Sequence, residues 1–242
     1  MLRTALVLAF LVPYAVIACP LAVLLSIVGR SAAPLYRLSE WGFRGAFLLA
    51  GIRITTEGRE RLGDVRNTVI VSNHASHLDP PALFLGLRTD FVALAKREVF
   101  DIPLFSTVIR RAGYIPIQRG NRADAAGAVA RMTTALREGA CVLVFAEGTR
   151  SHDGTLGPFK KGAFIAALDA GSRVLPVAID GTASLMPRHG YALRSGHVRI
   201  SVLEPVEAGR YDPAERDLLV AEVRSRIDHA LARGRGDEYR VA

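Results

Sequence analysis

The stretch that decides the fold is TVIVSNHASHLDPPALF (residues 68–84), in which an apolar, β-branched run stops at a polar cluster. Val69, Ile70 and Val71 are consecutive apolar residues, which is typical of a strand covered on both faces. Two prolines follow Asp79, and proline in the first helical turn after an aspartate N-cap favours a helix that starts at Pro80. The stretch therefore predicts a strand, a polar loop and a helix in succession.

Six further short runs are rich in valine and isoleucine or end at Gly, Pro or Asn, and we interpret them as strands. They are IRITTEG (52–58), FVALAK (91–96), GYIPIQ (113–118), CVLVFAE (141–147), RVLPVAI (173–179) and HVRISVLEPV (197–206). Helical patterns lie between and after them, with apolar stripes at Val129, Met132 and Leu136 and at Leu219, Val223, Ile227 and Leu231. The alternation predicts one α/β domain over residues 51–242, with a mostly parallel or mixed sheet flanked by helices.

The first 50 residues differ from the rest, because residues 4–29 contain no charged side chain. A membrane-spanning helix needs about 20 such residues. The next segment is also apolar but carries Arg37, Glu40, Arg44 and Trp41, which suits a membrane interface. We expect residues 1–50 to form a membrane-associated helix pair, either spanning or lying in one leaflet. A cleaved signal peptide and a buried hairpin of soluble helices are the alternatives.

The formal net charge of +8 favours an anionic partner. No zinc-finger spacing or RNA-binding aromatic motif is present, so nucleic acid is not indicated as the partner. Anionic lipid and phosphorylated small molecules remain as the partners that fit this charge.

His74 and Asp79 are the strongest candidates for chemistry. Five residues apart, they would lie about 140° apart on a continuous helix, but a strand–loop–helix turn can bring them together. A carboxylate beside an imidazole fixes its tautomer, and the other ring nitrogen can then take a proton from an alcohol. No G-x-S-x-G motif occurs, so the alcohol is expected to belong to a substrate. Asp79 as a simple helix cap, a structural loop histidine, and a metal site shared with His77 are the alternatives.

Further charged residues follow other predicted strands. Lys96 ends one run and Arg119 follows another, while Glu147 precedes a glycine-rich loop that contains Arg150 and ends at Lys160 and Lys161. Such a loop can expose backbone N–H groups to an anion, although it lacks the Walker spacing. Glu147 could bind a substrate hydroxyl or pair with an arginine.

Four blocks occur in the order seen in the glycerolipid acyltransferase family, which the chain resembles over residues 70–180. They are Asn73-His74 with four residues before Asp79, then GYIPIQR, EGTRS and VLPVAI. The resemblance implies that His74 is the general base and Asp79 its orienting partner. It implies a substrate-binding role for Lys96, Arg119, Glu147, Gly148, Thr149 and Arg150. Ala146 departs from the family's usual proline before the glutamate, which leaves the shape of that loop in question.

The same resemblance implies a reaction. A fatty acyl group would pass from acyl-CoA or acyl carrier protein to the free sn-2 hydroxyl of lysophosphatidic acid, giving phosphatidic acid at the cytoplasmic side of the membrane. No metal and no bound cofactor would be required. Another lyso-lipid acceptor (a lyso-ornithine lipid or glycolipid), a non-catalytic membrane-binding module and a metal-dependent hydrolase are the alternatives. Chain length, thioester donor and oligomeric state are left open.

Overall fold

The computed structural model describes residues 1–118, 120–151, 155–187 and 190–241. All seven predicted runs form strands, and the last of them is divided in two. The strands are β1 (Ile52–Glu57), β2 (Thr68–Ser72), β3 (Val92–Lys96), β4 (Ile115–Ile117), β5 (Cys141–Phe145), β6 (Arg173–Asp180), β7 (Gly196–Val202) and β8 (Val206–Glu207). They form one mixed sheet in the order β1-β7-β6-β2-β5-β3-β4, with β8 also paired to β6. The expectation of an α/β fold with a mostly parallel or mixed sheet is confirmed.

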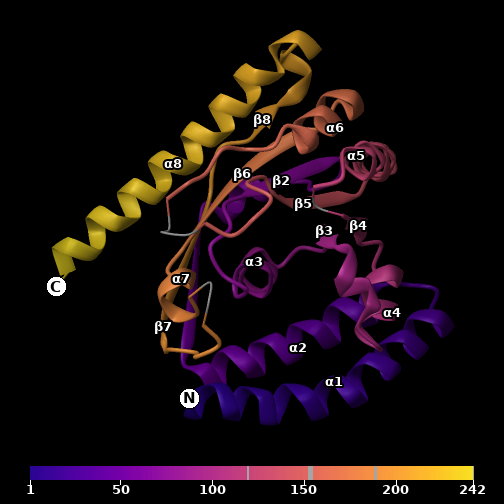
Figure 1. Cartoon of the computed structure of the whole chain (residues 1–242), viewed down its shortest axis with the longest axis vertical. Helices are drawn as coiled ribbons and strands as arrows, with labels where there is room; N and C mark the ends of the chain where they lie inside the picture. Colours follow the sequence, from indigo (N-terminus) through magenta and orange to yellow (C-terminus); the bar gives the residue numbers. More distant parts are fainter. Residues whose placement is uncertain (119, 152–154, 188–189, 242) are drawn as a thin grey trace.

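Helices surround this sheet (Figure 1). They are α1 (Leu2–Val28), α2 (Ala33–Ala50), α3 (Asp79–Leu87), α4 (Phe105–Arg111), α5 (Arg122–Arg137), α6 (Gly162–Ala170), α7 (Thr182–Leu185) and α8 (Arg216–Val241). Short 3₁₀ turns occur at Arg59–Leu62, Arg97–Asp101, Ala208–Arg210 and Pro213–Glu215. The turn before α8 carries a capping box formed by Asp212 and Glu215.

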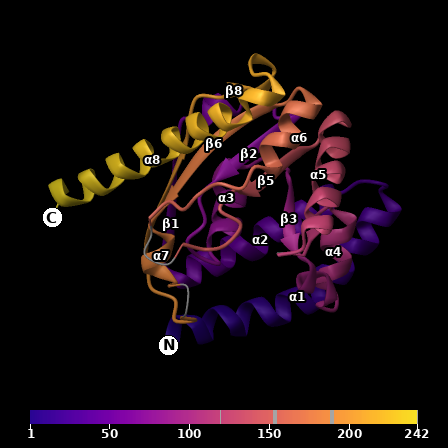
Figure 2. The same ribbon diagram turned by 45° about the horizontal axis from the view of Figure 1, so that its top comes forward.

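The sheet is covered on both faces, which explains why its central strands are apolar throughout. Val69 and Val71 face one core cluster, with α5, α6 and α8, while Ile70 faces the other, with α3 and α2. Because successive strand residues point to opposite faces, both must be apolar. The predicted stripe on α8 lies in the first cluster, with Leu219, Val223, Ile227 and Leu231 each at most 5% exposed. Figure 2 shows the sheet between these layers.

The parallel arrangement determines where the loops meet. β2 pairs in parallel with both β5 and β6, with Ser72 opposite Phe145 and Val177. The carboxyl ends of these three strands therefore lie at one edge of the sheet, where ligands bind in many α/β proteins. The loops that contain His74 and Glu147 both start at this edge.

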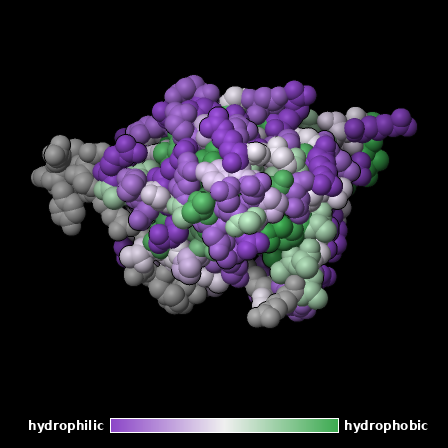
Figure 3. Space-filling view, turned by 90° about the horizontal axis from the view of Figure 1, so that it is seen from above, coloured by the Kyte–Doolittle hydropathy of each residue, from purple (hydrophilic) through white to green (hydrophobic). Residues whose placement is uncertain are grey.

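The amino-terminal segment forms the expected pair of helices. α1 and α2 lie side by side along one side of the molecule (Figure 1). α1 is helical through Pro13 and Pro20, and among the described residues it is the one helix long and apolar enough to cross a membrane. Large apolar side chains of this pair stay exposed, including Val28 at 75% and Leu48 at 81%. The opposite face of the molecule is largely hydrophilic (Figure 3).

Candidate active site

The loop after β2 brings His74 and Asp79 into direct contact. Nδ1 of His74 lies 2.7 Å from Oδ2 of Asp79. The same carboxylate oxygen accepts the backbone N–H groups of Ala75 and Ser76, at 2.7 and 2.8 Å. Asp79 is fully buried and His74 is 9% exposed. This geometry fixes Nδ1 toward the carboxylate and leaves Nε2 as the ring nitrogen that can exchange a proton with a substrate.

Asp79 does not serve as the helix cap that the sequence also allowed. α3 begins at Asp79 itself, and its preceding residue, Leu78, makes no side-chain cap hydrogen bond. The Asp79 carboxylate points back over the loop, where it accepts the hydrogen bonds from His74, Ala75 and Ser76. The prediction of an aspartate N-cap with the helix starting at Pro80 is therefore wrong, because the buried loop needs this acceptor.

Asn73 extends the sheet by one residue through its side chain. Its Nδ2 donates to the carbonyl oxygen of Ile179 at 2.8 Å, and its Oδ1 accepts the Ile179 backbone N–H at 2.9 Å. An amide side chain can make both bonds because it carries a donor and an acceptor side by side. The first residue of the loop is thus fastened to β6, immediately before His74.

Glu147, at the end of the β5 region, fastens the same loop from the other side. Its Oε1 accepts the backbone N–H of His74 at 2.8 Å, and its Oε2 accepts that of Gly157 at 2.9 Å. The side chain is 9% exposed. The glycine-rich loop was expected to offer N–H groups to an anion, and at Gly157 that anion is the protein's own Glu147. A Cβ at position 157 would lie 3.1 Å from Oε2, so glycine suits this approach.

Two further contacts hold His74. Its ring stacks on Phe145, with 4.2 Å between ring centroids and 22° between planes. Its carbonyl oxygen accepts the backbone N–H of Ser151 at 2.7 Å. Phe145 was not among the predicted site residues, and the sequence marks it only as the last strand residue before Ala146 and Glu147.

The predicted cationic residues that the structure describes have different surroundings. Arg150 lies close enough to His77 to affect it: burial lowers the pKa of His77, and Arg150 and His74 lower it further, while Asp79 opposes them. Lys96 ends β3, opposite Ile117 of β4, and its Nζ lies 2.7 Å from Glu98. Arg119 lies outside the described residues.

The two lysines at the end of the glycine-rich loop have different partners. Thr149 is exposed, and Gly148 has φ +72° with the Lys160 side chain lying against it. Lys161 instead pairs with Asp217 of α8, with 2.7 Å between Nζ and Oδ1. The structure therefore keeps Lys160 beside the predicted site residues, whereas Lys161 is engaged by α8.

An apolar cavity of about 360 Å³ adjoins this centre. Its wall includes Phe145 and Gly148 on the side of the predicted site residues. Helices α5 and α6 contribute Val129, Met132, Ala163 and Ile165. Phe145, which stacks on His74, is among the residues that line the cavity, whereas His74 and Asp79 are not.

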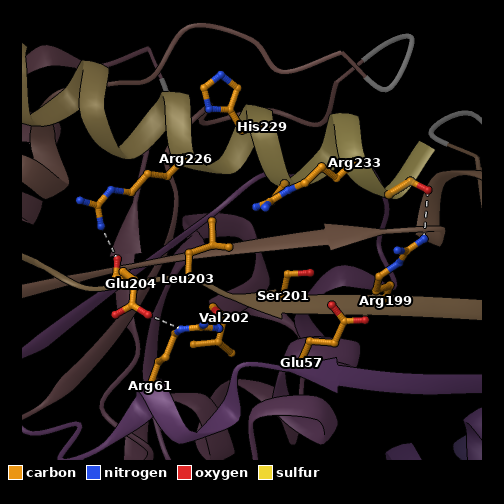
Figure 4. A pocket seen from close by; sticks show the side chains of 12 residues that line it. Glu57, Arg61, Arg199, Ser201, Val202, Leu203, Glu204, Arg226, His229 and Arg233 are labelled. Atoms are coloured by element: carbon orange, nitrogen blue, oxygen red, sulfur yellow. Dashed lines mark hydrogen bonds and ion pairs between the residues drawn. The ribbon is translucent and has the colours of Figure 1, made fainter. Parts of the chain in front are cut away.

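A larger groove lies elsewhere. It has a volume of about 560 Å³ and runs between α8 and the β1–β7 edge of the sheet (Figure 4). Arg61, Arg199, Arg226 and Arg233 line it together with Glu57 and Glu204, and it contains none of the predicted site residues. Within the described part of the chain, no three His, Cys, Asp or Glu side chains gather in a way that could hold a metal ion.

The family model for acyltransferases matches residues 53–180. A 1-acyl-sn-glycerol-3-phosphate acyltransferase of Borreliella burgdorferi is 30% identical over 179 residues, covering 74% of this chain and 72% of the relative. The chloroplastic LPAT1 of Arabidopsis thaliana, which carries the same name, is 35% identical over 181 residues, covering 74% of this chain and 49% of the relative. The chain thus spans about half the length of the chloroplastic relatives that it matches.

A solved structure agrees over nearly the full length. The crystal structure of PlsC, the 1-acyl-sn-glycerophosphate acyltransferase from Thermotoga maritima, superposes with a TM-score of 0.82 at 25% sequence identity. The superposition covers 97% of both chains, including the region of α1 and α2.

Proposed function

The chain belongs to the acyltransferase family, and from that premise we propose that it transfers a fatty acyl group from a thioester to the sn-2 hydroxyl of lysophosphatidic acid, forming phosphatidic acid. The observation that carries the proposal is the buried contact between His74 and Asp79 at the carboxyl edge of the sheet. The relatives are named 1-acyl-sn-glycerol-3-phosphate acyltransferases, and their names support this choice of acceptor.

The chemistry follows from the orientation of the imidazole. Asp79 accepts from Nδ1, so Nε2 is the atom that takes the proton from the acceptor hydroxyl. The hydroxyl oxygen attacks the thioester carbonyl and forms the new ester bond. The C–S bond breaks, and the thiolate leaves and takes the proton from Nε2 to become the free thiol. Asp79 stabilises the imidazolium while the proton resides there. In this scheme Glu147 positions the main chain of His74, since both of its oxygens accept backbone N–H groups.

The phosphate of the acceptor requires cationic partners, for which we propose Lys96, Arg119 and Arg150, with Gly148 and Thr149 lining the approach. Lys96 is half-exposed and paired with Glu98. Such a surface ion pair contributes only about 0–1 kcal/mol, so a phosphate can replace Glu98 at little cost.

The acyl chain and the membrane complete the proposal. The apolar cavity beside Phe145 is the space that we assign to the acyl chain. The exposed apolar side chains of α1 and α2 support attachment to a membrane. We propose that the site is open to the cytoplasmic side. Spanning and in-plane attachment both fit a helix of 27 residues.

Product analysis tests the proposal. The full chain, reconstituted in phosphatidylglycerol-containing vesicles, is incubated with lysophosphatidate and either labelled acyl-CoA or labelled acyl carrier protein. We expect labelled phosphatidic acid from at least one donor, and an unchanged rate with EDTA. Reaction with only phosphate-free lyso-lipids would contradict the assigned acceptor. Absence of transfer to any lyso-lipid, with vesicle binding intact, would favour a binding module, and chelator-sensitive release of fatty acid would favour a hydrolase.

A further inference from the structure

The main chain of His74 is held on both sides by one segment, residues 147–160, which we call the 147–160 loop. Glu147 accepts the N–H of His74, and the N–H of Ser151 donates to its carbonyl oxygen. The two ends of the loop meet where the N–H of Lys160 donates to the carbonyl oxygen of Ala146 at 2.7 Å. The position of the His74 main chain therefore depends on the described parts of this loop as well as on Asp79.

Arg224 of α8 binds the described part of this loop near its carboxyl end, at Leu156 and Gly157. Its Nη2 donates to the carbonyl oxygen of Leu156 at 2.7 Å, and its Nε donates to that of Gly157 at 3.2 Å. The N–H of the same Gly157 donates to Glu147. A continuous series of contacts thus runs from Arg224 through Gly157 and Glu147 to the backbone of His74.

We propose that Arg224 is a positioning residue of the active centre, which acts through Gly157 and Glu147 to hold His74 in place. Because it deepens the function proposed above, this inference rests on His74 being the catalytic base. No sequence motif marks Arg224, which lies 150 residues beyond His74 in the chain.

The surroundings of Arg224 make it a rigid anchor. Its neighbour Val223 is fully buried, and Ile227 one turn later is fully buried as well, so this part of α8 is fixed against the sheet. The guanidinium is a planar fork that can donate to two carbonyl oxygens at once, whereas a lysine ammonium matches this geometry less well. The half-buried position of the side chain limits competition by water.

The experiment compares Arg224→Ala, Arg224→Lys and Arg226→Ala in the full chain, assayed in vesicles with lysophosphatidate and the active thioester donor. Arg226 is a matched control, since it lies on the same helix and donates to the carbonyl oxygen of Glu204 at 2.7 Å, away from the loop. We expect Arg224→Ala to lower kcat about tenfold or more with KM within about twofold, because small displacements of a catalytic group cost large factors in rate. Arg224→Lys should recover part of kcat, and Arg226→Ala should retain it within about twofold.

Hydrogen–deuterium exchange provides a second readout that does not depend on activity. In Arg224→Ala the amides of His74 and Gly157 should exchange faster than in the wild type, while those of β1 should not change. A kcat unchanged by Arg224→Ala, or a His74 amide unchanged in exchange, would overturn the inference.

A double-mutant cycle that combines Arg224→Ala with Glu147→Gln measures whether the two residues act together. If Arg224 acts through Glu147, its loss should cost much less in the Glu147→Gln background; full additivity would overturn the inference. Failure of the proposed function is recognised separately, as full activity of His74→Ala, while the exchange data still report on the contacts between Arg224 and His74.

Discussion

Two regions of the molecule gather charged side chains, and they use charge in different ways. Around His74, the carboxylates of Asp79 and Glu147 are buried and both accept backbone N–H groups, and Asp79 also contacts the imidazole. In the groove under α8, Arg61 pairs with Glu204 at 2.6 Å, but these side chains are 37% and 68% exposed (Figure 4).

This difference shows that the number of charged side chains in a region does not identify the catalytic site; their burial and hydrogen bonding are more informative. Water weakens the exposed pairs of the groove, which therefore contribute little energy and impose little orientation. Hydrogen bonds stabilise a buried carboxylate, and the three that Oδ2 of Asp79 accepts fix the loop and the ring beside it. The smaller, more buried region is thus the better candidate for catalysis, and variants in both regions can test this contrast.

Replacement of the proposed base should have the largest effect. His74→Ala removes the group that we propose takes the proton, and we expect kcat to fall by about 10²–10⁴ or more. Circular dichroism and thermal unfolding should show a folded protein, since Ala75 and Ser76 still donate to Asp79. Activity within tenfold of the wild type in the vesicle assay would remove His74 from its role.

Asp79→Asn should have the next largest effect. The amide preserves the shape but loses the charge that stabilises the imidazolium, so we expect kcat to fall by about 10²–10³. The matched control is Asp217→Asn, which removes an exposed carboxylate that pairs with Lys161 on the surface. Equal losses for the two variants would show that burial of the carboxylate is not what matters, contrary to the comparison above.

The sequence predicts the framework of this site well, because the signals for it are local. The valine- and isoleucine-rich runs identify the strands, and the polar residues directly after them identify the edge where His74 and Glu147 meet. The carboxyl ends of parallel strands converge, so the contact between the loops follows from topology.

The sequence does not predict the contacts that depend on distant parts of the chain. Asp79 follows the local pattern of an N-cap, yet its carboxylate turns back to the loop and accepts the N–H groups of Ala75 and Ser76. Lys161 follows a glycine-rich loop as an anion-binding residue would, yet Asp217 lies beside it once α8 packs. In the sequence, Arg224 belongs to the polar face of a predicted helix, and its contact with Gly157 depends on how α8 packs in the fold.

Asn73→Ala should have an intermediate effect that appears mainly in stability. It leaves the buried N–H and carbonyl oxygen of Ile179 without the partners that Asn73 provides, at a cost of about 2–4 kcal/mol in the free energy of unfolding. Loosening of the loop should also lower kcat, though less than either change above. Asn67→Gly is the control, because Asn67 bonds Ser172 at the opposite end of β2 and glycine tolerates its φ of +48°. A similar loss of kcat per folded molecule in both variants would contradict a special role for the carboxyl edge.

The smallest effect is expected in the groove under α8. Glu204→Gln removes the carboxylate that Arg61 contacts while keeping the shape of the side chain. Since exposed pairs contribute little, we expect kcat, KM and the melting temperature to stay close to the wild type at physiological salt. The measurement is the same vesicle assay, repeated with Arg233→Ala, which removes a cation from the other end of the groove (Figure 4). A tenfold rise in KM for either substrate would place this groove on a substrate path, and the contrast between a buried catalytic region and a solvated charged one would then have to be abandoned.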